Sequence, residues 1–263
     1  MKQNIHILII CINRFKMKKS IGQLLLITIL VFLLSGCGLV YRVLLGVDSS
    51  VEWLTDCQIK KEFEKNKIPE DQCYVLDTAS YFHAVLKTTK MKADQIKNES
   101  LTIDSAKLLR IKEDYKDNLQ PVQIRYFNRK GIAIFKMINC YMRPFPTQSW
   151  NIENCFDVFP PKPISYLKNS NNENLEYFLP HIKSISGSSI TIDSLPKANY
   201  YALVFWNSFI KRPSKNLIKQ LDKYSREFPE QSTYILYVNN NNAEVWYLSD
   251  TDEKRKITKS IKQ

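Results

Sequence analysis

Two largely apolar segments near the C-terminus place the tightest limit on how this chain can fold. Tyr200 to Trp206 and Thr233 to Val238 each have the length of a strand and lack regular polar alternation. Such segments are typical of strands that are buried on both faces of a parallel sheet. Between them, Pro213 suits the first turn of a helix, and Leu217 and Leu221 lie on one helical face. The pattern therefore predicts a β–α–β unit.

Alternating residues further upstream predict a β-hairpin. Apolar residues alternate with polar ones from Val122 to Tyr126 and again from Ile132 to Ile138, and Asn128 to Gly131 supplies turn residues between them. Lys136 interrupts the apolar face of the second strand. Its long aliphatic stem would let the ammonium group reach solvent at a sheet edge.

The N-terminal half contains helical periodicity around one short strand. We expect a helix over residues 49–66, a strand over Cys73 to Leu76 and a second helix that begins at Thr78. The segment from Lys90 to Leu119 is highly charged. It predicts a mobile loop that includes a helical piece over residues 105–116.

The remaining segments complete an α+β fold. Leu175 to Ile182 has helical spacing, and Ala243 to Leu248 is predicted to be a terminal strand. Five prolines between residues 144 and 163 mark an irregular crossing, whose aromatic Trp150 and Phe156 favour packing against the fold. The expected order is therefore N-terminal helices plus a β-hairpin, then the β–α–β unit and a terminal strand.

The first forty residues have the three-part pattern of a secretory signal. A basic start at Lys18-Lys19 precedes an apolar run from Leu24 to Leu34, and small residues follow it. The run is shorter than the ~20 residues that span a bilayer. The tetrapeptide Leu34-Ser35-Gly36-Cys37 resembles the lipobox of bacterial lipoproteins. That resemblance implies cleavage before Cys37 and attachment of acyl chains to it.

Export changes the charge and the expected partners. Residues 1–36 contain five basic and no acidic side chains, so processing lowers the net charge from +12 to +7. Met17 is an alternative initiator, because a second apolar patch precedes it.

The residue after Cys37 bears on the membrane location. It is Gly38, whereas an inner-membrane retention signal has aspartate at this position. The resemblance therefore implies that the protein is anchored in the Gram-negative outer membrane and faces the periplasm. We expect attraction to anionic surfaces such as lipid headgroups and no nucleic-acid partner.

Six regions are expected along the chain. They are a signal peptide over 1–36, a lipid-anchored leader over 37–48, an N-terminal α+β region over 49–143, a Pro-rich crossing over 144–170, an α/β region over 171–250 and a basic tail over 251–263.

The α/β region resembles the first β–α–β unit of thioredoxin-like proteins. The resemblance rests on the strand and turn Ala202-Leu203-Val204-Phe205-Trp206-Asn207-Ser208-Phe209, followed by a helix and by Tyr234 to Asn239. In that family two cysteines lie at the N-terminus of the helix, where the helix dipole favours the thiolate. Ile210 and Pro213 occupy those positions here. The resemblance therefore implies a thioredoxin-like fold without thiol–disulfide exchange.

Four cysteines follow the lipobox, namely Cys57, Cys73, Cys140 and Cys155. In an oxidising compartment they are candidates for two disulfides, and three connectivities stay open. Cys57–Cys73 and Cys140–Cys155 are the local pairs. The alternative is that some of the four are buried small apolar residues.

Recognisable catalytic patterns are missing. His83 and His181 are the histidines that remain after processing, and neither belongs to a metalloprotease, hydrolase or phosphate-loop motif. We therefore expect no catalytic residue, metal site or cofactor. Three tripeptides that begin at Asp77, Asp104 and Asp193 resemble O-glycosylation sites of some Gram-negative bacteria, and they also suit helix caps, which we favour.

These observations favour a lipid-anchored, non-catalytic binding or scaffold protein of the cell envelope with an envelope protein as partner. The candidate binding surface consists of Trp206, Asn207, Ser208, Phe209, Lys211 and Arg212. An envelope enzyme is the alternative, either a thiol redox enzyme or a hydrolase with an unrecognised site. A third hypothesis is an immunity or inhibitor lipoprotein.

Overall fold

The computed structural model describes residues 52–99, 105–143, 147–165 and 173–248. The predictions for the signal peptide, Met17, the lipidated Cys37, the leader and the basic tail lie outside the described residues.

A six-stranded mixed sheet forms the centre of the fold, in the order β3–β2–β5–β6–β1–β4. The inner strands β5, β6 and β1 are parallel, and β2, β3 and β4 are antiparallel to their neighbours. The strands are β1 (Cys73–Leu76), β2 (Gln123–Asn128), β3 (Ala133–Ile138), β4 (Ile182–Ser184), β5 (Tyr200–Trp206) and β6 (Thr233–Asn239).

The described residues also form six α-helices, which confirms the predicted α+β class. They are α2 (Asp56–Lys65), α3 (Thr78–Glu99), α4 (Ser105–Asn118), α5 (Leu175–Phe178), α6 (Lys211–Glu227) and α7 (Asn241–Leu248). Short 3-10 turns are η1 (Glu70–Gln72), η2 (Asn139–Tyr141), η3 (Ile152–Asn154), η4 (Leu179–His181) and η5 (Ile192–Ser194).

The predicted β–α–β unit is confirmed as β5–α6–β6. The two strands pair in parallel from Tyr200 opposite Thr233 onward. Successive β5 side chains enter different cores, with Val204 on the face that α6 covers and Leu203 on the other face. Helix α6 packs Leu217 and Leu221 against the first of these faces. A strand buried on both sides has no need of polar alternation, as the sequence indicated.

The predicted hairpin is confirmed as β2–β3, but the expectation of one polar face is wrong. Every β2 residue from Gln123 to Phe127 is buried. On β3 the buried positions include Ala133, Phe135 and Met137, whereas Ile134 is half-buried. The second face of the hairpin is covered because α5 and the first turns of α3 contribute to the core there.

One prediction for the C-terminal elements is wrong, and another is confirmed except at its last residue. Residues 243–248 belong to helix α7 and not to a terminal strand. Asn239 Oδ1 accepts the N–H of Asn241 at 3.1 Å, which turns the chain, and Trp246 then stacks on Phe82 with ring centroids 4.9 Å apart. The predicted helix over 175–182 is α5 followed by η4, and Ile182 already begins edge strand β4.

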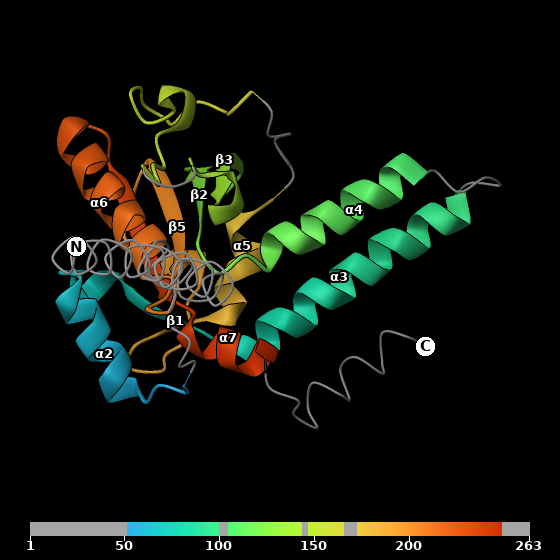
Figure 1. Ribbon diagram of the computed structural model, residues 1–263, viewed down its shortest axis with the longest axis horizontal. Helices are drawn as coiled ribbons and strands as arrows, with labels where there is room; N and C mark the ends of the chain where they lie inside the picture. Colours follow the sequence, from blue (N-terminus) through green and yellow to red (C-terminus); the bar gives the residue numbers. More distant parts are fainter. Residues whose placement is uncertain (1–51, 100–104, 144–146, 166–172, 249–263) are drawn as a thin grey trace, which may run out of the picture. The chain divides into compact units, whose positions relative to one another are not determined.

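The N-terminal helices also differ from the prediction. Helix α2 begins at Asp56, because Thr55 and Gln58 form a capping box. Residues 90–99 are helical and not part of the predicted loop, since α3 continues to Glu99. The helical piece predicted over 105–116 is confirmed as α4. Figure 1 shows α3 and α4 as a helical hairpin that runs away from the sheet.

Candidate functional site

The candidate binding surface at the end of β5 is mostly interior. Trp206, Asn207 and Phe209 are buried, and Ser208 is half-buried. Only Lys211 and Arg212, at the start of α6, are exposed among the six. These six residues therefore do not form one continuous surface that a partner could contact.

Ile210 and Pro213 lie at the N-terminus of α6, as predicted. Ile210 is the N-cap residue and donates its N–H to Asn207 Oδ1 at 2.9 Å. Pro213 is buried in the first turn, and its carbonyl accepts a hydrogen bond from Trp150 Nε1 at 2.9 Å. Core packing therefore fills the place where a redox pair would lie.

Asparagines hold together the turns that follow β5 and β6. Asn207 and Asn240 both donate to the carbonyl of Pro121, at 3.4 and 2.8 Å. Asn241 Nδ2 donates to Ser208 Oγ at 2.6 Å. Ligands of open α/β sheets bind beyond the carboxyl ends of the strands. Here the polar side chains at that edge bond to one another and to backbone.

All four cysteines are free in the structure, so neither local disulfide pair is formed. Burial raises the pKa of Cys73 to about 12 and that of Cys155 to about 11, which keeps both thiols protonated. Cys57 and Cys140 are exposed, and Cys140 Sγ donates to Gln120 Oε1 at 2.9 Å. The alternative of buried, unreactive cysteines describes Cys73 and Cys155.

The histidines differ from one another. His83 is exposed on α3, whereas His181 Nδ1 lies 2.7 Å from Ser80 Oγ. Partial burial lowers the pKa of His181, although the nearby Asp77 carboxylate opposes this shift. That carboxylate pairs with Lys183 Nζ at 2.7 Å. The Ser80–His181 contact was not expected, because no sequence motif joins the two residues.

The described residues of the three Asp-Ser/Thr tripeptides all lie in or next to helical elements. Asp77 Oδ1 accepts the Ser80 N–H at 3.2 Å, so Asp77 caps α3 and Thr78 is buried. Ser105 is the exposed first residue of α4. Ser194 completes a capping box with Thr191 in η5. Capping therefore accounts for the first and third tripeptides.

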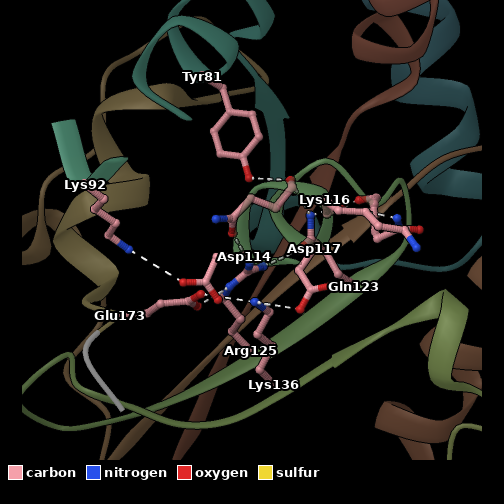
Figure 2. Close-up of polar contacts among 11 residues, drawn as sticks. Tyr81, Lys92, Asp114, Lys116, Asp117, Gln123, Arg125, Lys136 and Glu173 are labelled. Carbon is pink, nitrogen blue, oxygen red and sulfur yellow. Dashed lines mark hydrogen bonds and ion pairs between the residues drawn. The ribbon is translucent and has the colours of Figure 1, made fainter. Parts of the chain in front are cut away.

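A buried ionic network lies where the helical hairpin meets the sheet (Figure 2). Its centre is Arg125 of β2, which is fully buried. Arg125 Nε donates to Glu173 Oε2 at 2.6 Å, and another guanidinium nitrogen donates to Asn118 Oδ1 at 2.5 Å. A third bond goes to Gln123, and the guanidinium lies 4.7 Å from the ring centroid of Phe178.

Lys136 extends this Arg125 network. Its ammonium lies 3.3 Å from Glu173 and 3.4 Å from Asp117 at the end of α4. Burial alone would raise the pKa of Glu173, but the charges of Arg125 and Lys136 outweigh it and lower that pKa to about 2. Two cations thus face two carboxylates within the fold.

Tyr81 ties the other helix of the hairpin to the same place. Its hydroxyl donates to the carbonyl of Asn118 at 2.8 Å, which joins the first turn of α3 to the last residue of α4. Arg125 was not singled out from the sequence, because it is one of the polar residues that alternate with apolar ones in this strand. One signal was available: Arg125 and Lys136 pair directly across the hairpin, and like charges at such positions need intervening acids.

Beyond this base, the helical hairpin contributes little to the core. The buried residues of α3, among those described, lie between Thr78 and Val85, and α4 has none. Met91 and Leu109 are 62% and 57% exposed. The exposed basic residues of the two helices are Lys87, Lys92, Lys107, Arg110, Lys112 and Lys116. Glu113 is the single acidic residue in the exposed class on their described parts.

Metal and membrane signatures are lacking within the described ranges. No group of His, Cys, Asp and Glu in them is arranged to hold a metal ion. No helix there is both long enough and apolar enough to cross a bilayer.

Comparison of the sequence and structure with family models, curated proteins and solved structures gives no match.

Proposed function

We propose that this protein is a lipid-anchored, non-catalytic binding or scaffold protein of the outer membrane, and that the α3–α4 hairpin contacts its partner. The observation that carries the proposal is the contrast between the inner and the exposed sides of the hairpin. On the inner side the Arg125 network fixes its base, whereas the exposed side carries basic and apolar side chains that the core does not use.

The base of the hairpin supports a binding role because it holds the helices in one orientation. Buried charges are costly unless each is paired and hydrogen-bonded. Arg125 meets this condition through Glu173, Asn118 and Gln123, and Lys136 through Glu173 and Asp117. A pre-oriented surface loses less conformational entropy when it binds than a flexible one does.

The N-terminus of α6 supports a role without redox chemistry. The thioredoxin-like assignment remains a proposal, supported by the parallel β5–α6–β6 unit and by Ile210 at the N-cap. No thiolate can form at Ile210 or Pro213. A degenerate thioredoxin-like domain of this kind would serve as a scaffold for the hairpin.

Cross-linking in the native envelope tests the proposed function. The lipidated protein is compared with the hairpin triple variant Arg110→Glu, Lys112→Glu, Lys116→Glu and with the control Lys215→Glu, Lys219→Glu, Lys223→Glu on α6. Both variants change the charge equally at exposed positions. We expect the hairpin variant to lose the cross-linked species and the control to keep it. Equal yields from both would refute the hairpin as the contact.

A hydrolase is the second candidate, because Ser80 Oγ lies within hydrogen-bond distance of His181 Nδ1. In that reaction Oγ attacks an acyl carbonyl carbon, its proton passes to Nδ1 and then to the leaving group, and water hydrolyses the acyl-serine. A fluorophosphonate that labels the wild type but not Ser80→Ala would establish this alternative. No labelling would remove it.

Thiol titration tests the redox alternative. We expect a maleimide to modify the exposed Cys57 and Cys140 in the native protein, and the buried Cys73 and Cys155 only after unfolding. Rapid native labelling of Cys73 or Cys155 would contradict this. The immunity or inhibitor hypothesis would be supported if the cross-linked partner is a toxin.

A further inference from the structure

We propose that the exposed basic residues of α4 lie against the anionic headgroups of the membrane to which the chain is tethered. This inference rests on the proposed function, and it names anionic phospholipid as the partner chemistry of the hairpin.

The charge of the exposed hairpin surface is the first argument. Arg110, Lys112 and Lys116 are exposed on α4, and the exposed acid between them is Glu113. The other carboxylates near the end of α4 are each paired with a lysine, Asp114 with Lys92 at 3.7 Å and Asp117 with Lys136 at 3.4 Å. The surface that remains is positive. An anionic membrane surface attracts such a cluster.

The exposed apolar side chains are the second argument. Met91 and Leu109 are well exposed on two helices that pack side by side. Basic residues with interspersed large apolar ones are typical of helices that lie in the headgroup region, where apolar groups enter shallowly and lysine stems snorkel. A purely polar partner would leave Leu109 without a contact.

The tether is the third argument. Cys37, the proposed lipidation site, lies 15 residues before Glu52, the first described residue. A chain of that length spans at most about 50 Å. The domain is therefore confined near the bilayer, at an effective concentration on the order of millimolar. Each basic residue near an anionic surface strengthens binding by roughly five-fold, so a few of them suffice.

Hydrogen exchange on vesicles tests this inference. The full lipidated protein is reconstituted in phosphatidylcholine vesicles with or without about one-third phosphatidylglycerol, and exchange of the 105–118 segment is followed by mass spectrometry. We expect several-fold slower exchange on the anionic vesicles. At 1 M salt, where the screening length falls to about 3 Å, the slowing should disappear.

The variants separate lipid contact from other causes. The hairpin triple variant Arg110→Glu, Lys112→Glu, Lys116→Glu should abolish the slowing. The α6 control variant Lys215→Glu, Lys219→Glu, Lys223→Glu should leave it unchanged. The wild-type dependence on lipid and salt requires no variant, so the test does not depend on the folding of either. Equal exchange on both vesicle types, or slowing that survives 1 M salt, would overturn the inference. If the envelope cross-links to a protein nevertheless depend on α4, the proposed function stands and an envelope protein is the partner.

Discussion

Helices α4 and α6 are both highly charged, yet the fold uses them in opposite ways. The 17 residues of α6 bury six side chains, including Leu217, Leu221 and Tyr224, against the sheet. The 14 residues of α4 bury none. Helix α4 instead packs along α3, and its last turn enters the Arg125 network. Helix α6 therefore serves the core, whereas the exposed side chains of α4 are available for binding.

Breaking the network at its centre should have the largest effect. Arg125→Met leaves Glu173 buried without its main cation and removes the bond to Asn118. Loss of one partner of a buried ion pair costs about 3–5 kcal/mol. We expect a loss of that size in the free energy of unfolding measured with urea. Arg110→Met, at an exposed position of α4, should change the free energy of unfolding by less than about 0.5 kcal/mol. Equal losses from the two variants would contradict the distinction between the buried network and the exposed surface of the hairpin.

A pair of leucines tests the comparison of the two helices directly. Leu221→Ala on α6 removes a fully buried side chain and should cost about 2–5 kcal/mol. Leu109→Ala on α4 removes an exposed one and should cost less than about 0.5 kcal/mol. Thermal or chemical unfolding measures both. A costly Leu109→Ala would show that α4 packs more tightly than its exposure indicates.

The pH dependence of stability should reflect Glu173. Its pKa is about 2 in the folded protein, against an ordinary value of 4.5. Because the pKa of Glu173 is lower in the folded protein than in the unfolded chain, its ionised carboxylate stabilises the fold at pH values above about 5. That stability is lost as the pH falls from about 5 to about 2. The contribution is about 3 kcal/mol. The difference in unfolding free energy between wild type and Glu173→Gln should therefore shrink across this range. A difference that stays constant would rule out the ionic role.

The smallest effect is expected at the link between the two helices. Tyr81→Phe removes the hydroxyl that donates to the carbonyl of Asn118. The loss of one such bond costs about 1 kcal/mol. Hydrogen exchange near the end of α4 should accelerate accordingly, by roughly five-fold, while exchange in α6 stays the same. Equal acceleration in both helices would indicate global destabilisation and not a local link.

Local pattern was enough to predict β1, β2, β3, β5, β6 and α6. Tyr200 to Trp206 and the Asn128–Gly131 turn carry their own signals, since apolar runs and turn residues act within a few positions. The helical piece over 105–116 was predicted, and its half-buried apolar stripe consists of Leu108, Ile111 and Tyr115. The continuation of α3 beyond residue 90 was missed, because the high charge of that segment favoured a loop.

The site required information from distant residues. Trp206 to Phe209 looked like a surface, but Pro121 and Asn240, far away in the sequence, cover the turn. Arg125 stands at a polar position of an alternating strand, and its partners Glu173 and Asn118 come from outside that strand. Periodicity reveals which residues share a face. It does not reveal which element covers that face.

Photo-cross-linking in intact cells tests the central claim most directly. A photoreactive residue replaces Leu109, Lys112 or Lys116 on α4, or Lys215, Lys219 or Lys223 on α6, all of which are exposed. We predict that adducts with lipid or protein form at the α4 positions at least several-fold more often than at the α6 positions. Equal or greater yields from α6 would contradict the account, because the hairpin would then not be the binding element.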